Sequence, residues 1–192
     1  MPEDVDERYW SARYIAYLGQ LQLQGESGTM VLQTLLRELA HYRATLLAVT
    51  RAIRQLATTP AYALHVHHLV GIDGISTVTA MILMTELIEL ARFHSLDRLA
   101  SYVGLVPGEH SSGDERTITG LTERKNPYLR WILIECAWCA VRKDPALMQA
   151  FAELTKRMTK NRAIIRIARK LLNRVRFVLK NGQPCVNLAI VA

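Results

Sequence analysis

The sequence predicts a mainly α-helical protein, with a helical arm over residues 1–60 and a compact helical domain over residues 61–192 that contains a helix-hairpin-helix-like element. Apolar residues recur at spacings of three and four over long stretches, which is the period of a helix. Hydrophobic residues make up 50% of the chain, and only 10 of the 192 residues are glycine and 6 are proline. This composition is typical of a chain that packs a core, and it excludes the disordered and collagen-like classes.

The arm contains a sustained heptad pattern. Apolar residues recur from Leu32 to Leu56 with alternating spacings of three and four, and neither Pro nor Gly interrupts them. This length is sufficient for a coiled coil, so the pattern predicts a homo-oligomer formed through Leu32 to Leu56. Leu36 and Leu47 widen the apolar stripe, so packing within a bundle of the chain's own helices is an equal alternative.

Breaks are expected on both sides of the heptad segment. Residues 8–23 favour a weakly amphipathic helix, which we expect to end before Gly25, Ser27 and Gly28. At the other side, Pro60 follows two threonines and marks the end of the long helix.

Two glycines precede the next predicted helix, an apolar segment from about Thr77 to Ala91. Backbone N–H groups in a tight turn at a helix N-terminus can face an anion, so Gly71, Gly74 and Ser76 are candidate contacts to a DNA phosphate. A plain corner between two helices would use the same glycines, and the sequence does not separate the two interpretations.

A polar segment from Val106 to Lys125 follows a short helix predicted over Leu96–Val103 with Ser95 as its cap. Pro107 and several glycines in this segment predict a loop of about 20 residues. Loops of this length in a compact domain are typically functional or disordered.

Three basic helices are predicted after this loop. Asn126-Pro127 and Asp144-Pro145 each place a helix N-cap residue before a proline at the first helical position. The last helix is expected over Arg162–Lys180, with apolar residues on one face and basic residues on the other. Such a stripe could follow a phosphate backbone, but an ordinary solvated face has the same composition.

The net charge of +7 is unevenly distributed along the chain. Residues 1–109 carry a net charge of −3, whereas residues 110–192 carry +10 and all six lysines. A one-sided positive field suggests a polyanionic partner, with nucleic acid as the first candidate and a merely solvated basic surface as the alternative.

Other residue clusters predict no further site. Cys136 and Cys139 form a CxxC spacing inside a buried-looking helix without a second ligand pair, so we expect both to pack in the core. The histidines at 65, 67 and 68 lack a partner at a metal-ligand spacing, so no metal site is predicted. The acidic N-terminus does not resemble a signal peptide, and no apolar run reaches the roughly 20 residues of a membrane span, so we expect a cytoplasmic protein with reduced cysteines and no membrane partner.

Several motifs occur in an order that resembles a known family: Arg92-Phe93, Leu99-Ala-Ser-Tyr-Val-Gly-Leu-Val-Pro107, Ser112-Gly113, Gly120-Leu-Thr122 and Asn126-Pro-Tyr-Leu-Arg130. They resemble the C-terminal domain of insertion-sequence transposases that pair an N-terminal RuvC-like domain of four acidic residues with a helical domain bearing a nucleophilic serine. Some members of that family are recombinases guided by a structured bridge RNA. The resemblance covers about residues 64–180.

The resemblance implies a serine nucleophile for DNA strand exchange. It assigns this role to Ser112, directly before Gly113, with Ser111 as the alternative. Positive charges would have to stabilise the phosphoryl oxygens in the transition state. The candidate DNA-binding residues of this segment are Arg116, Arg124, Lys125, Asn126 and Arg130.

The chain departs from the family pattern in three ways. Asp73 places a carboxylate beside the proposed phosphate site, where it would weaken anion binding. Glu123 and Lys125 stand where the family pattern has a lysine and a glycine. Finally, we expect no RuvC-like domain upstream of the matching segment, because the acidic residues there do not lie in predicted strands.

These departures lead to two functional hypotheses. In the first, the chain is a DNA-binding transposase-family protein that lacks the acidic domain and is inactive in recombination by itself, with DNA and a structured guide RNA as partners. It has no cofactor of its own, since Mg²⁺ is expected only with the carboxylates of the RuvC-like domain. The alternative is a non-catalytic DNA-binding and dimerisation module.

Overall fold

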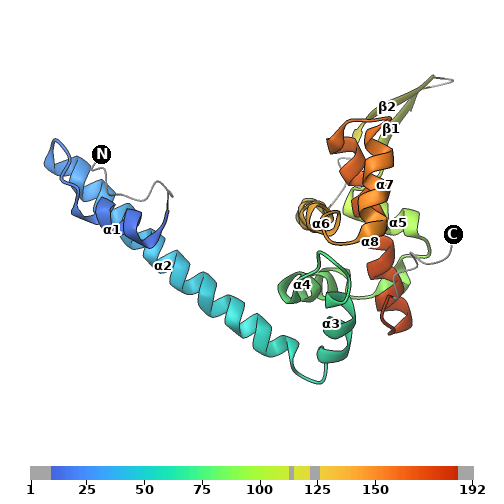
Figure 1. Ribbon diagram of the computed structural model, residues 1–192, viewed down its shortest axis with the longest axis horizontal. Helices are drawn as coiled ribbons and strands as arrows, with labels where there is room; N and C mark the ends of the chain where they lie inside the picture. Colours follow the sequence, from blue (N-terminus) through green and yellow to red (C-terminus); the bar gives the residue numbers. More distant parts are fainter. Residues whose placement is uncertain (1–9, 113–114, 122–125, 186–192) are drawn as a thin grey trace. The chain divides into compact units, whose positions relative to one another are not determined.

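The computed structural model describes residues 10–112, 115–121 and 126–185. The chain divides into two compact units, Met1–Ala52 and Ile53–Ala192, and each is described separately. The predicted mainly α-helical fold is confirmed, since helices make up most of the described chain (Figure 1).

The first unit contains α1 (Ala12–Gln20) and most of α2 (Glu26–Ala57), which is one long, continuous helix (Figure 1). The expectation that Ser27 and Gly28 interrupt the helical segment is wrong, because both lie inside α2. The turn is made instead by Gly25, whose φ of 104° is a conformation that favours glycine.

Two side chains of α2 reach back to the segment around α1. Gln33 Nε2 donates a hydrogen bond to the Gly19 carbonyl at 2.9 Å, and Arg43 Nη2 donates to the Trp10 carbonyl at 3.0 Å. Gly19 lies in the last turn of α1 and Trp10 lies just before the helix, so these bonds hold α1 against one side of α2.

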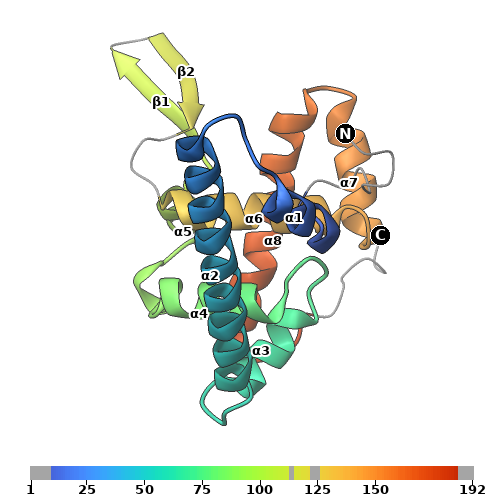
Figure 2. The ribbon, with the colours of Figure 1, turned by 90° about the vertical axis from the view of Figure 1, so that its left-hand side faces the viewer.

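The second unit is a helical bundle arranged around α8 (Lys160–Asn181). Eight residues of α8 are buried, and the helix contacts α3, α5, α6, α7 and the 3-10 helix η1 (Figures 1 and 2). The remaining elements are α3 (Ala63–Val70), α4 (Thr77–Leu87), η1 (Leu90–Arg92), α5 (Leu96–Val103), α6 (Pro127–Ala140) and α7 (Pro145–Thr155).

The apolar helix predicted from Thr77 to Ala91 ends earlier, at Leu87. The chain then reverses at Ile88, whose φ of 37° is outside the helical region, and continues into η1. This turn returns Leu90 and Phe93 to the core, where both pack against buried residues. Burial of these two side chains therefore explains why the helix stops although its sequence remains apolar.

The prediction of a loop from Val106 to Lys125 is wrong for most of these residues. Residues Pro107–Ser112 (β1) and Glu115–Leu121 (β2) form an antiparallel hairpin with a register irregularity next to Pro107 (Figure 2). Thr117, Ile118 and Thr119 are β-branched residues, which favour a strand. Pairing with a second strand supplies the backbone hydrogen bonds that a loop would lack.

The two predicted Pro-containing helix starts are confirmed. Asn126 Oδ1 accepts a hydrogen bond from the Leu129 N–H, and Asp144 Oδ1 accepts from the Leu147 N–H, each at 3.0 Å. Asp144 is fully buried and also forms an ion pair with Arg174 of α8. Burial by itself raises the pKa of Asp144, but the hydrogen bonds from Arg174 and Leu147 outweigh burial and lower it below its ordinary value.

Candidate nucleic-acid interface

The hairpin β1–β2 begins and ends at the same place, the C-terminal end of α5. Helix α5 ends at Gly104, which has a φ of 84° and donates its N–H to the Ala100 carbonyl at 2.9 Å. On the return side, the Asn126 N–H donates to the Tyr102 carbonyl at 2.9 Å. The last turn of α5 therefore fixes both ends of the segment that carries the candidate serines.

Asn126 is fixed by three hydrogen bonds at this base. Besides its N–H bond to Tyr102 and its capping bond from Leu129, its Nδ2 donates to Glu86 Oε2 at 2.8 Å. Glu86 belongs to α4, so Asn126 joins the ends of α4, α5 and α6. The geometry gives this candidate DNA-binding residue a positioning role within the protein.

An exposed cation, Arg92, lies beside the same base. Its guanidinium carbon is 4.6 Å from the ring centroid of Phe93 and 4.9 Å from that of Tyr102, so it stacks on both rings. Its Nη2 also donates to the Glu86 carbonyl at 3.4 Å. Sequence reasoning did not assign Arg92 to the site, although the Arg92-Phe93 pair was one of the motifs that carried the family resemblance.

The candidate serines lie at the end of β1 that is distant from this base. The strand register pairs Ser111 with Arg116 and Ser112 with Glu115. Five steps along an extended strand place Ser112 about 17 Å from Pro107.

The candidate phosphate-binding cations are not brought together with Ser112 in the described structure. Arg130 lies in the first turn of α6, next to Asn126 at the base of the hairpin. Arg116 is paired in register with Ser111 in the hairpin itself. Arg124 and Lys125 lie outside the described residues.

The glycine turn between α3 and α4 is in close contact with α6. Gly74 has a φ of 90°, and a Cβ at this position would lie 2.4 Å from the Cys136 carbonyl oxygen, which no side chain tolerates. Gly71 instead ends α3 with a φ of −64°, and its N–H donates to the His67 carbonyl at 3.3 Å. Packing against α6 thus accounts for glycine at position 74 without a ligand.

Ser76, the third candidate residue of this turn, caps α4. Its Oγ accepts a hydrogen bond from the Thr79 N–H at 3.1 Å and lies 2.9 Å from Thr79 Oγ1. The hydroxyl group therefore already satisfies one of the free N–H groups at the start of the helix.

A row of exposed basic residues lies on α8. Arg162, Arg166 and Lys170 are exposed at intervals of four residues and form no ion pair with another described residue. Arg169 forms an ion pair with Asp97, so it adds no unpaired positive charge to this row. Arg157 and Lys160 are further exposed basic residues before this stripe, whereas Lys156 is paired with Glu153.

The cysteines and histidines do not form a ligand set. Cys136 is buried, and burial raises the pKa of its thiol to about 11. The expectation that Cys139 packs in the core is wrong, because it is exposed on α6 and accepts a hydrogen bond from Arg142. Across residues 10–112, 115–121 and 126–185, no group of three or more His, Cys, Asp or Glu could hold a metal ion. No helix in the described part of the chain is long and apolar enough to cross a membrane.

Part of the chain is similar to known transposases. Residues 66–153 match the model of the Transposase IS116/IS110/IS902 family. "Putative transposase y4qE" of Sinorhizobium fredii is 32% identical over 136 residues, which cover 69% of this chain and 30% of that protein. The transposase for insertion sequence element IS1111A of Coxiella burnetii is 31% identical over 104 residues, which cover 52% of this chain and 29% of that protein. The chain thus matches less than a third of the length of either relative.

Proposed function

We propose, from the similarity of residues 66–153 to transposases of the IS116/IS110/IS902 family, that this chain acts in DNA transposition and that its second unit binds DNA. The basic face of α8 is the observation that supports DNA binding most directly. Its exposed cations follow one side of a helix, so they can meet successive phosphates along a strand. A stripe of unpaired charges in the more basic half of the chain fits a polyanion better than a neutral partner.

The proposed chemistry is transfer of a DNA phosphate to Ser112. The serine oxygen forms a bond to phosphorus, the bond from phosphorus to one deoxyribose oxygen breaks, and the serine proton ends on the leaving oxygen. The resulting phosphoserine ester retains the energy of the broken bond for rejoining a strand. Ser111, which is paired in register with Arg116, is the alternative nucleophile.

The resemblance assigns Mg²⁺ to the four carboxylates of a RuvC-like domain, and the described residues of this chain offer no comparable cluster. We therefore propose that the described residues contribute DNA binding and the serine, and that Mg²⁺ acts through the carboxylates of a RuvC-like domain.

A salt titration with double-stranded DNA, finished on a denaturing gel, tests this proposal. We expect binding that weakens steeply with salt, and a covalent adduct when a RuvC-like domain and Mg²⁺ are supplied. Ser112→Ala should abolish the adduct and leave salt-sensitive binding unchanged, with Ser111→Ala as the matched control. An adduct that survives Ser112→Ala but not Ser111→Ala would move the nucleophile, and binding that is insensitive to salt would contradict the proposed interface.

The second candidate function is a non-catalytic DNA-binding and dimerisation module. The bonding of Gly71, Gly74, Ser76 and Asn126 within the protein favours it, because packing and capping account for these residues without a reaction. Salt-sensitive binding without any adduct, in the presence of the supplied domain and Mg²⁺, would support this function over strand transfer.

Two further partners belong to the same proposal. A structured guide RNA would compete with DNA for the basic surface, so competition by such an RNA in the same titration tests it. Self-association through Leu32 to Leu56 is proposed because α2 exposes large apolar side chains, including Leu35, Tyr42 and Leu46.

A further inference from the structure

Arg92 is an exposed residue whose position is fixed by the residues around it. The chain reverses at Ile88 and continues into η1, which ends at Arg92. Leu90 and Phe93, on either side of Arg92, pack against the buried core. The backbone at Arg92 is therefore held in place, while its side chain stays on the surface of the second unit.

The guanidinium group of Arg92 is held by two aromatic rings. It stacks on Phe93 and Tyr102, whose ring centroids lie 5.2 Å apart. Both rings pack against the core, so they form a firm support for the cation. A side chain that is already ordered loses less conformational freedom when it binds a partner, which favours binding at this position.

Most hydrogen-bond donors of Arg92 remain without a partner among the described residues. A guanidinium group has five N–H donors. One of them, on Nη2, is directed at the Glu86 carbonyl at 3.4 Å, and no other hydrogen bond joins Arg92 to a described residue. A phosphate group can accept two parallel N–H bonds from one guanidinium group. The remaining donors therefore suit a phosphate.

The positive charge of Arg92 is not neutralised by a described carboxylate. Glu86 Oε2 accepts its hydrogen bond from Asn126 instead. Asp97 is paired with Arg169, and the exposed Glu89 forms no ion pair with Arg92. An anionic partner would supply the missing negative charge.

Arg92 is also connected to both features on which the proposed function depends. The helix η1 packs against α8, which carries the row of exposed basic residues. On the other side, Tyr102 stacks on Arg92 and accepts the N–H of Asn126 at the base of the hairpin. A phosphate bound by Arg92 can therefore belong to the same DNA that contacts α8.

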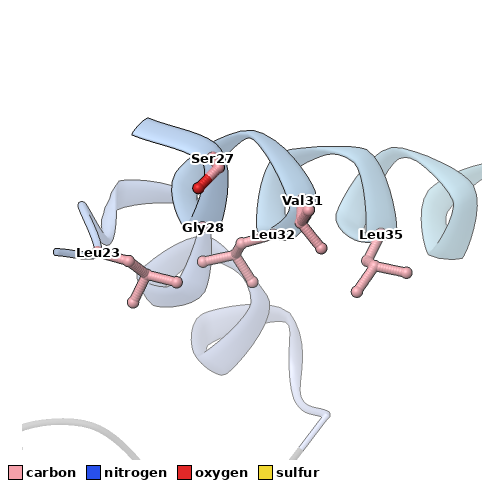
Figure 3. Close-up of a pocket in the computed structure, with 6 residues that line it drawn as sticks. All are labelled: Leu23, Ser27, Gly28, Val31, Leu32 and Leu35. Carbon is pink, nitrogen blue, oxygen red and sulfur yellow. The ribbon is translucent and has the colours of Figure 1, made fainter. Parts of the chain in front are cut away.

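The apolar groove of the first unit has a different character. It is a shallow hollow of about 470 Å³ (Figure 3). Its lining residues are Leu23, Ser27, Gly28, Val31, Leu32 and Leu35. None of these residues carries a charge, so the groove offers no countercharge to a phosphate.

We infer that the guanidinium group of Arg92 binds a phosphate of the DNA backbone beside the base of the hairpin. Ser112 lies at the other end of β1, so this phosphate is not the one that would react with the serine. The inference rests on the DNA binding proposed above and adds a specific contact to it. It does not depend on the serine chemistry.

A salt titration of the full chain with a mixed-sequence DNA duplex tests this contact. Arg92→Gln removes one phosphate contact, so we expect the magnitude of the slope of log K against log salt concentration to fall by about 0.9. Arg98→Gln is the matched control, because Arg98 is exposed on α5 and forms no ion pair with a described residue. It removes the same charge and should keep the parent slope. Equal falls in both variants would overturn the inference.

Arg92→Lys separates a phosphate contact from a role in packing. Lysine keeps the charge and binds phosphate as a point charge, but it lacks the planar group that stacks on two rings. We expect this variant to keep the parent slope. Circular dichroism checks that all three variants retain their helix content. If Arg92→Lys loses as much of the slope as Arg92→Gln, the loss follows from packing and the inference is overturned.

The parent chain shows which proposal fails. If it binds DNA with a steep salt dependence and Arg92→Gln keeps that slope, the contact at Arg92 is wrong and the proposed DNA binding still holds. If the parent chain binds without salt dependence, or does not bind, both are wrong.

Discussion

Gly74 is a residue whose role depends on packing as well as on backbone conformation. Its φ of 90° disfavours any side chain, and a Cβ would collide with the Cys136 carbonyl oxygen of α6. The sequence indicated that a turn lay here but not that another helix approaches it, because the contact joins residues more than sixty positions apart. The same limit applies to Cys139, whose exposure depends on how α6 packs.

Replacing Gly74 should therefore destabilise the second unit. We expect Gly74→Ala to lower the free energy of unfolding by about 2 to 4 kcal/mol, from backbone strain and displacement of α6. Urea denaturation measures this loss. Gly71→Ala is the matched control, because its φ of −64° suits alanine and the loss should stay below about 1 kcal/mol. Equal losses at both positions would contradict the close contact with α6.

Asp144 gives the second unit a pH-dependent contribution to stability. Its pKa is lowered in the folded state, so the contribution is complete above the ordinary pKa of 3.8 and is lost as the pH falls through the lower folded-state value. Asp144→Asn keeps an N-cap acceptor for Leu147 but leaves Arg174 without its anionic partner. We expect a loss of about 3 kcal/mol at pH 7 in urea denaturation, and a smaller difference from the parent chain at about pH 3. A difference that stays constant with pH would contradict the ion-pair explanation.

At the scale of elements, the sequence predicted the features that depend on neighbouring residues and missed those that depend on contacts between distant residues. The helix starts at Ser95, Asn126 and Asp144 were predicted, because a capping side chain bonds to its own helix. The hairpin β1–β2 was missed, because its sequence is mostly polar and lacks the regular alternation that predicts a strand. The sequence predicted which segment carries the candidate serines. It did not predict the bond from Asn126 to Glu86 or the contact of Arg92 with Tyr102, because these residues are distant in the sequence from the segment.

The bond between Asn126 and Glu86 should determine how firmly the hairpin is anchored. Asn126→Asp keeps a good N-cap, yet it replaces the Nδ2 donor with a carboxylate facing Glu86. We expect a loss of about 1 to 2 kcal/mol at neutral pH, although asparagine and aspartate cap helices equally well. Adding Glu86→Gln should recover most of it, because the glutamine amide can donate to the new carboxylate. A double-mutant cycle in urea measures the coupling, and purely additive losses would contradict the bond.

At the scale of the whole molecule, the charge is divided in a way that matches the two proposed surfaces. The net charge is −3 over residues 1–109 and +10 over residues 110–192, so the positive charge that suits a polyanion lies in the part of the chain that contains α8. Apolar residues on α2 and basic residues on α8 thus lie in different units, so each surface can be changed separately.

The salt dependence of DNA binding is the property that most directly tests the surface on α8. Each phosphate contact contributes about 0.9 to the slope of log K against log salt concentration. Replacing Arg162, Arg166 and Lys170 with Gln should therefore reduce the magnitude of the slope by about 2.7 if all three contact phosphates. The replacements lie on the exposed side of α8, so the unfolding free energy should change little.

A matched control separates this local effect from the overall charge. Arg37, Arg51 and Arg54 are exposed on α2, outside the heptad pattern of apolar residues, and their replacement with Gln removes the same three charges. If α8 contacts the phosphates, the α2 variant keeps the parent slope, whereas the slope of the α8 variant falls by about 2.7. Equal reductions in both variants would mean that DNA responds to net charge alone, and the proposed interface on α8 would then be wrong.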